Sequence, residues 1–141
     1  MNREMLMLVD AIAREKNVER DLVFAAVESA LAQATKKLLQ SDKEQPIADP
    51  DIRVSIHRDT GEYETFRRWL VVDDSAGLQN PDAEEMLMDA VERVADIQVD
   101  EYIEETIPSL PIGRIGAMAA KQVILQKIRD AEREMLLADF L

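Results

Sequence analysis

The 141 residues (16.0 kDa) suffice for one domain, and 47% hydrophobic residues with only four glycines and five prolines exclude a collagenous or disordered chain. The absence of cysteine and the single histidine exclude disulfides, thiolate metal sites and most triad chemistry. The formal charge of −12 argues against general nucleic-acid binding, but residues 73–105 hold twelve acids and one base, so the rest of the chain is free to form local basic patches.

Two helices are predicted at the start of the chain. Apolar residues recur at i, i+3, i+4 and i+7 from Met5 to Ile12, and Asn2 can cap the first turn, so we expect a helix over residues 3–16. A second, longer apolar stripe runs from Leu22 to Leu38 and contains several alanines. Small side chains let another helix approach closely, and the two segments are therefore interpreted as a helical hairpin ending near Leu39.

A loop and a β-hairpin follow. Residues 41–50 contain two prolines and mixed charges without periodicity, which predicts an exposed loop. Apolar and polar residues alternate over residues 52–56, the pattern of a half-buried strand, and Asp59-Thr60-Gly61 can form the turn. The partner strand is predicted over residues 63–72, which are rich in aromatic and β-branched types.

The remainder is predicted to hold a helix, a strand and a long terminal helix. Asn80-Pro81-Asp82 has the features of a helix start, and this short helix should run to about Val94. Residues 99–107 are predicted as a strand that two prolines close off. An apolar stripe with helical spacing predicts the longest element of the chain over residues 113–140.

The predicted order is α-α-β-β-α-β-α, which indicates an α+β fold with a small, mostly antiparallel sheet. We expect a single domain over residues 1–141. A helical body (residues 3–39 and 113–140) would carry a β-containing head (residues 51–108) in this arrangement.

Five basic residues outside the acidic segment are candidates for phosphate contact. Arg114 and Lys121 are seven residues apart, which on one helix places them about two turns apart on nearly the same side, and Arg129 lies within about a quarter-turn. Lys36 and Lys37 close the second helix. Each set also has a simpler interpretation, because exposed helix charges commonly only interact with water and cations near a helix C-terminus complement its dipole.

The acidic residues favour interaction rather than catalysis. Their adjacent pairs lack the spacing of a calcium loop, so residues 73–105 form either a solvated acidic face or a patch that docks on a basic protein. No nucleophile–base pair, metal-ligand set or phosphate loop is present, so we expect no enzyme, no catalytic, metal or cofactor residues and no small-molecule substrate. No apolar run approaches the ~20 residues of a bilayer crossing, and the start does not resemble a signal peptide, so a cytoplasmic location without membrane contact is expected.

Four stretches resemble a known family: Glu15-Lys16, FAAVESALAQATKK (residues 24–37), RVSIHRDTGEYETFRRWLVVD (53–73) and GRIGAMAAKQVILQKIRDAEREMLLADF (113–140). They closely resemble the N-terminal domain of the bacterial transcription elongation factor NusA, most specifically in ETFRRWLVVD and AAKQVILQKIRDAERE. The resemblance covers essentially the whole chain.

The resemblance implies a non-catalytic fragment that lacks downstream OB-type and KH RNA-binding domains. In the family this domain binds RNA polymerase at the β flap beside the RNA exit channel, prolongs pausing, assists hairpin-dependent termination and takes part in antitermination. Family positions proposed to face the nascent RNA hairpin match Arg114 and Lys121, and cations after the second helix match Lys36 and Lys37. The alternative is an acidic protein–protein adaptor that makes no RNA contact.

The sequence departs from the family pattern at three places. Apolar residues 116–120 precede Lys121 where the family commonly has polar ones, so RNA contacts through those neighbours are not expected. Asp100-Glu101 stands where the family often has Gly-Asp, which predicts a different turn before the next strand. The loop of residues 41–50 is longer than in some relatives, and the resemblance assigns it no role.

Overall fold

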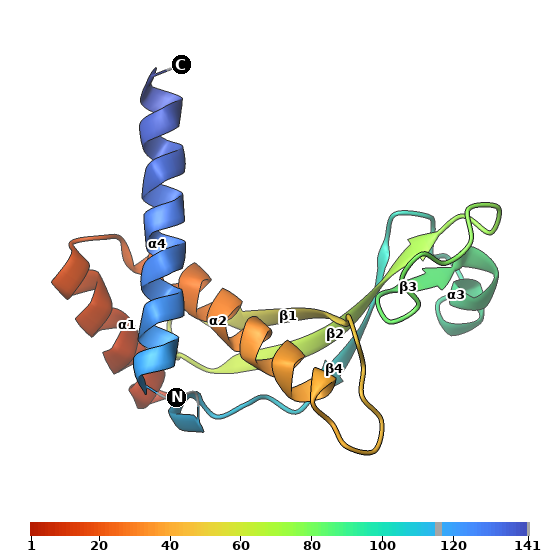
Figure 1. Cartoon of the computed structure of the whole chain (residues 1–141), viewed down its shortest axis with the longest axis horizontal. Coiled ribbons are helices and arrows are strands. Elements are labelled where there is room, and N and C mark those ends of the chain that lie inside the picture. Colours follow the sequence, from red (N-terminus) through yellow and green to blue (C-terminus); the bar gives the residue numbers. More distant parts are fainter. Residues whose placement is uncertain (115–116, 141) are drawn as a thin grey trace.

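The computed structural model describes residues 1–114 and 117–140 and places the helices and the sheet in two regions (Figure 1). The elements in chain order are α1 (Arg3–Lys16), α2 (Arg20–Gln40), β1 (Asp51–Ile56), β2 (Tyr63–Val72), β3 (Glu84–Met86), α3 (Leu87–Arg93), β4 (Tyr102–Ile107), a 3₁₀ helix (Ile112–Arg114) and α4 (Ala117–Phe140). The helices α1, α2 and α4 gather at one end, here called the helical body. The sheet runs away from them toward α3, and residues 73–101 at that far end are here called the acidic head.

This arrangement confirms the predicted α+β class and the predicted order of helices and strands, with a three-residue strand, β3, added before α3. The first helix is confirmed at both ends. The Asn2 side chain accepts a hydrogen bond from the Met5 amide at 3.0 Å, as an N-cap does. At the other end Asn17 is left-handed (φ 54°), and the following Val18 amide donates to the Ala13 carbonyl at 3.0 Å.

The sheet is centred on β2, which has partners on both edges. Strand β4 runs antiparallel along one edge, while β1 (antiparallel) and β3 (parallel) share the other. In this register Thr65 lies opposite both Val54 and Ile107. The prediction of a mostly antiparallel sheet is confirmed.

One face of the sheet carries two apolar clusters. Near the helical body, Val54 and Ile56 are buried together with residues of α1, α2 and α4. Toward the acidic head, Val71 and Ile103 are buried with Ala90 of α3. Because side chains alternate along a strand, this one face of β2 serves both regions.

The predicted helix start at Asn80 is wrong, although the predicted end near Val94 holds. The Glu84 carboxylate accepts hydrogen bonds from the Gln79 and Asn80 amides at 2.8 and 2.6 Å. Residues 84–86 then pair with β2 beyond the end of β1, where the edge of β2 would otherwise lack partners. The helix α3 therefore begins only at Leu87.

Strand β4 begins three residues later than predicted. Asp100 has a positive φ of 74°, the left-handed conformation that glycine adopts most readily. Its amide donates to the Val71 carbonyl at 2.9 Å, so the turn is tied to the end of β2. The turn expected to differ from the family pattern is thus built with a strained aspartate.

The β1–β2 hairpin is closed by Gly61 (φ 75°), whose amide donates to the His57 carbonyl at 2.8 Å. The turn rests on the start of α1, where the Asn2 amide donates to the Thr60 carbonyl at 2.7 Å. His57 itself is exposed. Among residues 1–114 and 117–140, no helix has the length and apolar character of a membrane span.

Candidate nucleic-acid interface

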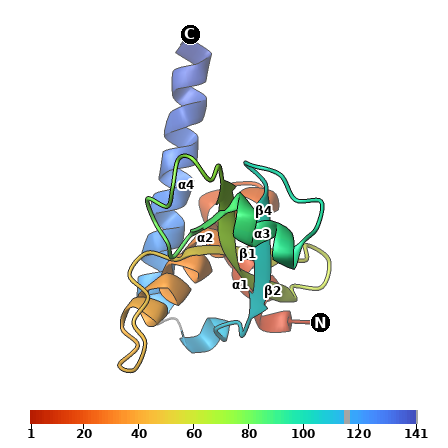
Figure 2. The ribbon, with the colours of Figure 1, turned by 90° about the vertical axis from the view of Figure 1, so that its right-hand side faces the viewer.

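The helices that carry the predicted RNA contacts pack against one another. Ile124 and Ile128 of α4 are buried in the same cluster as Val27 and Leu31 of α2. Figure 2 shows α4 rising alongside α2 at the helical body. The fold therefore brings two cationic segments, more than 70 residues apart in the sequence, onto neighbouring helices.

Arg114 and Lys121 do not share one described α-helix. Arg114 ends a 3₁₀ helix, whereas Lys121 belongs to α4, which begins at Ala117. Helical spacing therefore cannot place the two residues on one ridge, and that part of the prediction is corrected. The side chains of both residues lie outside the part of the chain that the structure describes, so their predicted role in RNA contact stays a prediction.

Arg129 lies in the described part of α4 and is exposed. Because it shares α4 with Lys121, the predicted offset of about a quarter-turn between the two positions holds. Among the side chains that the structure describes, none forms a hydrogen bond or ion pair with the Arg129 guanidinium. It is thus available for a phosphate.

Lys36 and Lys37 point in different directions because successive helical residues are about 100° apart. The Lys36 ammonium is 2.7 Å from a carboxylate oxygen of Asp49, and its side chain is 40% exposed. Lys37 is exposed and has no polar partner among the described residues. The two adjacent lysines therefore differ in their availability to a phosphate.

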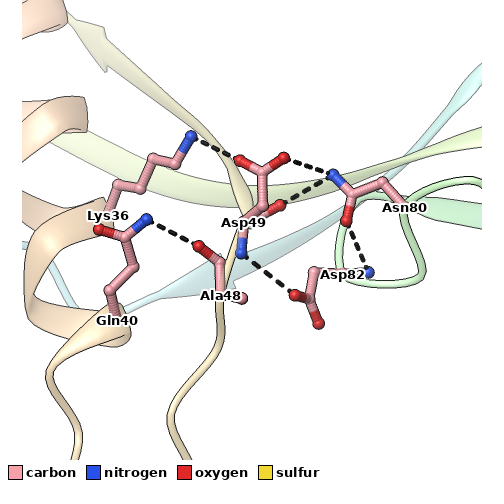
Figure 3. A network of polar contacts seen from close by, with 6 residues as sticks. All are labelled: Lys36, Gln40, Ala48, Asp49, Asn80 and Asp82. Atoms are coloured by element: carbon pink, nitrogen blue, oxygen red, sulfur yellow. Dashed lines mark hydrogen bonds and ion pairs between the residues drawn. The ribbon is translucent and has the colours of Figure 1, made fainter.

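The loop of residues 41–50 joins α2 to the acidic head through Asp49 (Figure 3). The Asn80 side chain donates to both the Asp49 carbonyl and its carboxylate, at 3.1 and 2.8 Å. The Asp49 amide donates to the Asp82 carboxylate at 3.1 Å. At the near end, the Gln40 side chain donates to the Ala48 carbonyl at 2.7 Å.

The tip of this loop has its own stabilising turn. The Asp42 carboxylate accepts hydrogen bonds from the amides of Glu44 and Gln45 at 2.9 and 3.2 Å. These two N–H groups lower the pKa of Asp42 below its ordinary value, because they favour the charged form. The turn therefore keeps its charged acceptor at neutral pH and loses it only in acid.

Lys127 is a cation near this surface that helical spacing did not single out. It lines a hollow of about 310 Å³ between α2 and α4, together with Gln33 of α2 and Gln126 of α4. On the helical wheel Lys127 lies well away from Lys121, and only the contact between the two helices reveals its position. The position of Lys127 at this surface therefore follows from the packing of α4 against α2 and not from the sequence pattern.

The acidic head uses part of its charge structurally and exposes the rest. Glu84 binds two backbone amides, and Glu85 pairs with Arg93 at 2.7 Å. Among residues 1–114 and 117–140, no group of three or more acids or histidines could hold a metal ion. The head also exposes large apolar side chains: Leu78, Met88, Val91, Val94 and Val99.

These features define an α+β domain with basic residues on α2 and α4 of the helical body and an acidic, partly apolar head. The sequence model of the NusA N-terminal domain family matches residues 4–134. The proteins named transcription termination/antitermination protein NusA of Rickettsia conorii and Rickettsia prowazekii are each 31% identical over 139 residues, 99% of this chain and 26% of theirs. The solution structure of the N-terminal domain of NusA from B. subtilis is similar with a TM-score of 0.58 at 28% identity, over 94% of this chain and 99% of that one.

The chain belongs to the NusA N-terminal domain family. It spans only 26% of the length of the curated relatives named above.

Proposed function

We propose that this domain docks a transcription termination/antitermination factor on RNA polymerase and presents cations to the emerging RNA. The observation that carries the proposal is the family match over residues 4–134, together with relatives named for termination and antitermination. Because the chain spans 26% of those relatives, OB-type and KH domains downstream are part of the same proposal. Pausing, hairpin-dependent termination and antitermination would depend both on this domain and on the downstream RNA-binding domains.

The proposed polymerase contact is the β flap, beside the RNA exit channel. This position would bring the helical body close to RNA as it leaves the enzyme. The proposal follows from the family resemblance, and the separation of charge in this chain supports it. Eleven of the twelve net negative charges lie in residues 73–105, so the cations of α2 and α4 lie outside the most acidic segment of the chain.

The proposed RNA contact is electrostatic. Lys37 and Arg129 are exposed and have no polar partner in the described part of the chain, and Arg114, Lys121 and Lys36 complete the set. A-form RNA presents phosphates that such cations can bind without reading the bases. The contact should therefore respond to RNA shape and weaken as salt is added.

Replacing Arg114 and Lys121 together by alanine should reduce hairpin-stimulated pausing and leave polymerase binding largely intact. Loss of two phosphate contacts should make the slope of log affinity against log salt shallower by about two. The measurement combines a pausing assay with a salt titration of RNA stem-loop binding. The matched control is Arg14→Ala/Lys16→Ala, which removes the same charge from exposed positions at the end of α1. Unchanged pausing in the Arg114/Lys121 variant would contradict the assignment.

A second candidate function is an adaptor whose acidic head binds a basic protein without RNA. The observation that favours it is the exposed pair Met88 and Val91, which are 55% and 39% exposed and one turn apart on α3. The acids Asp89 and Glu92 flank them. Apolar side chains bordered by acids fit a partner with an apolar pocket bordered by lysine or arginine.

Under this second function, Met88→Glu/Val91→Glu should raise the Kd for core RNA polymerase by about tenfold, as the loss of an apolar anchor does. Met7→Glu is the matched control, because Met7 is 71% exposed on α1, outside the acidic head. Salt titrations of polymerase and RNA binding, performed separately, distinguish the two functions. Equal effects of both substitutions would exclude the acidic head as the docking surface.

A further inference from the structure

Of the two adjacent lysines that are candidates for RNA binding, Lys36 forms an ion pair with Asp49 (Figure 3). We propose that Asp49 competes with RNA phosphate for Lys36, and that binding of RNA releases the link between α2 and the acidic head. Asp49 would then act as a positioning residue, because RNA could contact Lys36 only after the ion pair with Asp49 breaks. The inference rests on the proposed RNA contact of α2.

The pair can be exchanged because solvent reaches both groups. The Lys36 and Asp49 side chains are 40% and 60% exposed, although their charged atoms are only 2.7 Å apart. An ion pair this exposed adds little net stability, because water and salt compete with it. A phosphate brought near Lys36 by the cations of α2 and α4 can therefore replace the carboxylate.

The local charges make the two contacts mutually exclusive. Lys36 and Asp49 line a hollow of about 340 Å³ whose wall also carries Asp51 and Glu84. Arg68 pairs with Asp51 at 3.3 Å, but three carboxylates still outnumber the two cations and disfavour a phosphate in this hollow. Lys36 must therefore leave Asp49 and turn outward to meet RNA.

Breaking the pair would loosen the contact between α2 and the loop of residues 41–50, because Asp49 is bound on both sides. One carboxylate oxygen binds Lys36 of α2, and the other accepts a hydrogen bond from Asn80 at 2.8 Å. Among the ion pairs within residues 1–114 and 117–140, this is the only one that ties α2 to the loop of residues 41–50. Without it, two hydrogen bonds are left to hold the loop against the end of α2, from the Gln40 side chain to the Ala48 carbonyl at 2.7 Å and from the Ile47 amide to the Leu39 carbonyl at 3.1 Å.

Lys37 provides the internal contrast. It is exposed and has no polar partner in the described part of the chain, so it can bind phosphate without first breaking a contact. Lys37→Ala should therefore weaken RNA binding by the native chain more than Lys36→Ala does. In an Asp49→Asn background the two losses should become similar.

The test is a double-mutant cycle on binding of a short RNA stem-loop at low salt. Asp49→Asn should tighten binding by about two- to fivefold, the range expected for an exposed ion pair. The gain should disappear in the double variant Lys36→Ala/Asp49→Asn. Asp42→Asn is the matched control, because it makes the same charge change in the same loop and should not produce this gain.

Four results would overturn the proposal. Equal gains in RNA affinity from Asp49→Asn and Asp42→Asn, or a gain that persists without Lys36, would show that the effect comes only from removing a negative charge. Absence of saturable RNA binding in every variant would instead remove the proposed RNA contact on which the inference rests. Finally, RNA should speed hydrogen exchange at the Ile47 amide, which donates to the Leu39 carbonyl of α2 at 3.1 Å, and unchanged exchange would show that the loop is not released from α2.

Discussion

Replacing Gly61 by alanine should lower the free energy of unfolding by about 3 kcal/mol. A non-glycine residue in the left-handed conformation (φ 75°) costs about 1–2 kcal/mol. The added Cβ would lie 2.6 Å from the Asn2 carbonyl oxygen and 3.0 Å from Leu6, so backbone must move, at a cost of about 1–3 kcal/mol. Urea unfolding followed by circular dichroism measures the loss.

The matched control for this substitution is Gly77→Ala. Gly77 has a similar φ of 69°, but a Cβ there would have no atom within 4 Å. This variant should show only the conformational cost, about 1–2 kcal/mol. Equal losses at both glycines would mean that the hairpin turn does not rest tightly on the start of α1.

Replacing Phe24 by alanine should cost about 3–5 kcal/mol, the range for removal of a buried aromatic ring. Phe24 is only 1% exposed and lies at the centre of the cluster shared by the helices of the body and β1. The Arg58 guanidinium lies 4.9 Å from the ring centre and also binds Glu28 at 3.1 Å. The cavity would therefore weaken the attachment of the hairpin to α2 as well.

Phe66→Ala is the comparison for Phe24. Phe66 is half-buried on the opposite face of the sheet, where the Arg53 guanidinium lies 4.5 Å from its ring centre. Partial exposure limits the expected loss to about 1–2 kcal/mol. Parallel urea titrations measure both variants, and a loss at Phe66 as large as that at Phe24 would contradict the assignment of the core to the α2 face.

Much of the fold could be predicted because local signals agree with it. The cap at Asn2 and the left-handed Asn17 fix both ends of α1, and alternation from Ile52 to Ile56 identifies β1. The start of α3 could not be predicted in the same way. The residues at Asn80 have the features of a helix start, but residues 84–86 pair as a strand with the otherwise unpaired edge of β2.

The candidate site was less predictable because it depends on tertiary contacts. The sequence identifies Lys36 and Lys37 as adjacent cations, yet only the folded loop places Asp49 against the first and leaves the second exposed. The seven-residue spacing of Arg114 and Lys121 places them on one side of a helix only if both residues belong to the same continuous α-helix. A 3₁₀ helix that ends at Arg114 removes that basis.

The most direct test of the central claim is a titration of this chain against core RNA polymerase and against polymerase that lacks the tip of the β flap. Docking at the flap should give saturable binding to the first enzyme that is lost with the second. Equal binding to both enzymes would contradict docking at the flap. Binding to neither would contradict the claim that this domain docks on polymerase by itself.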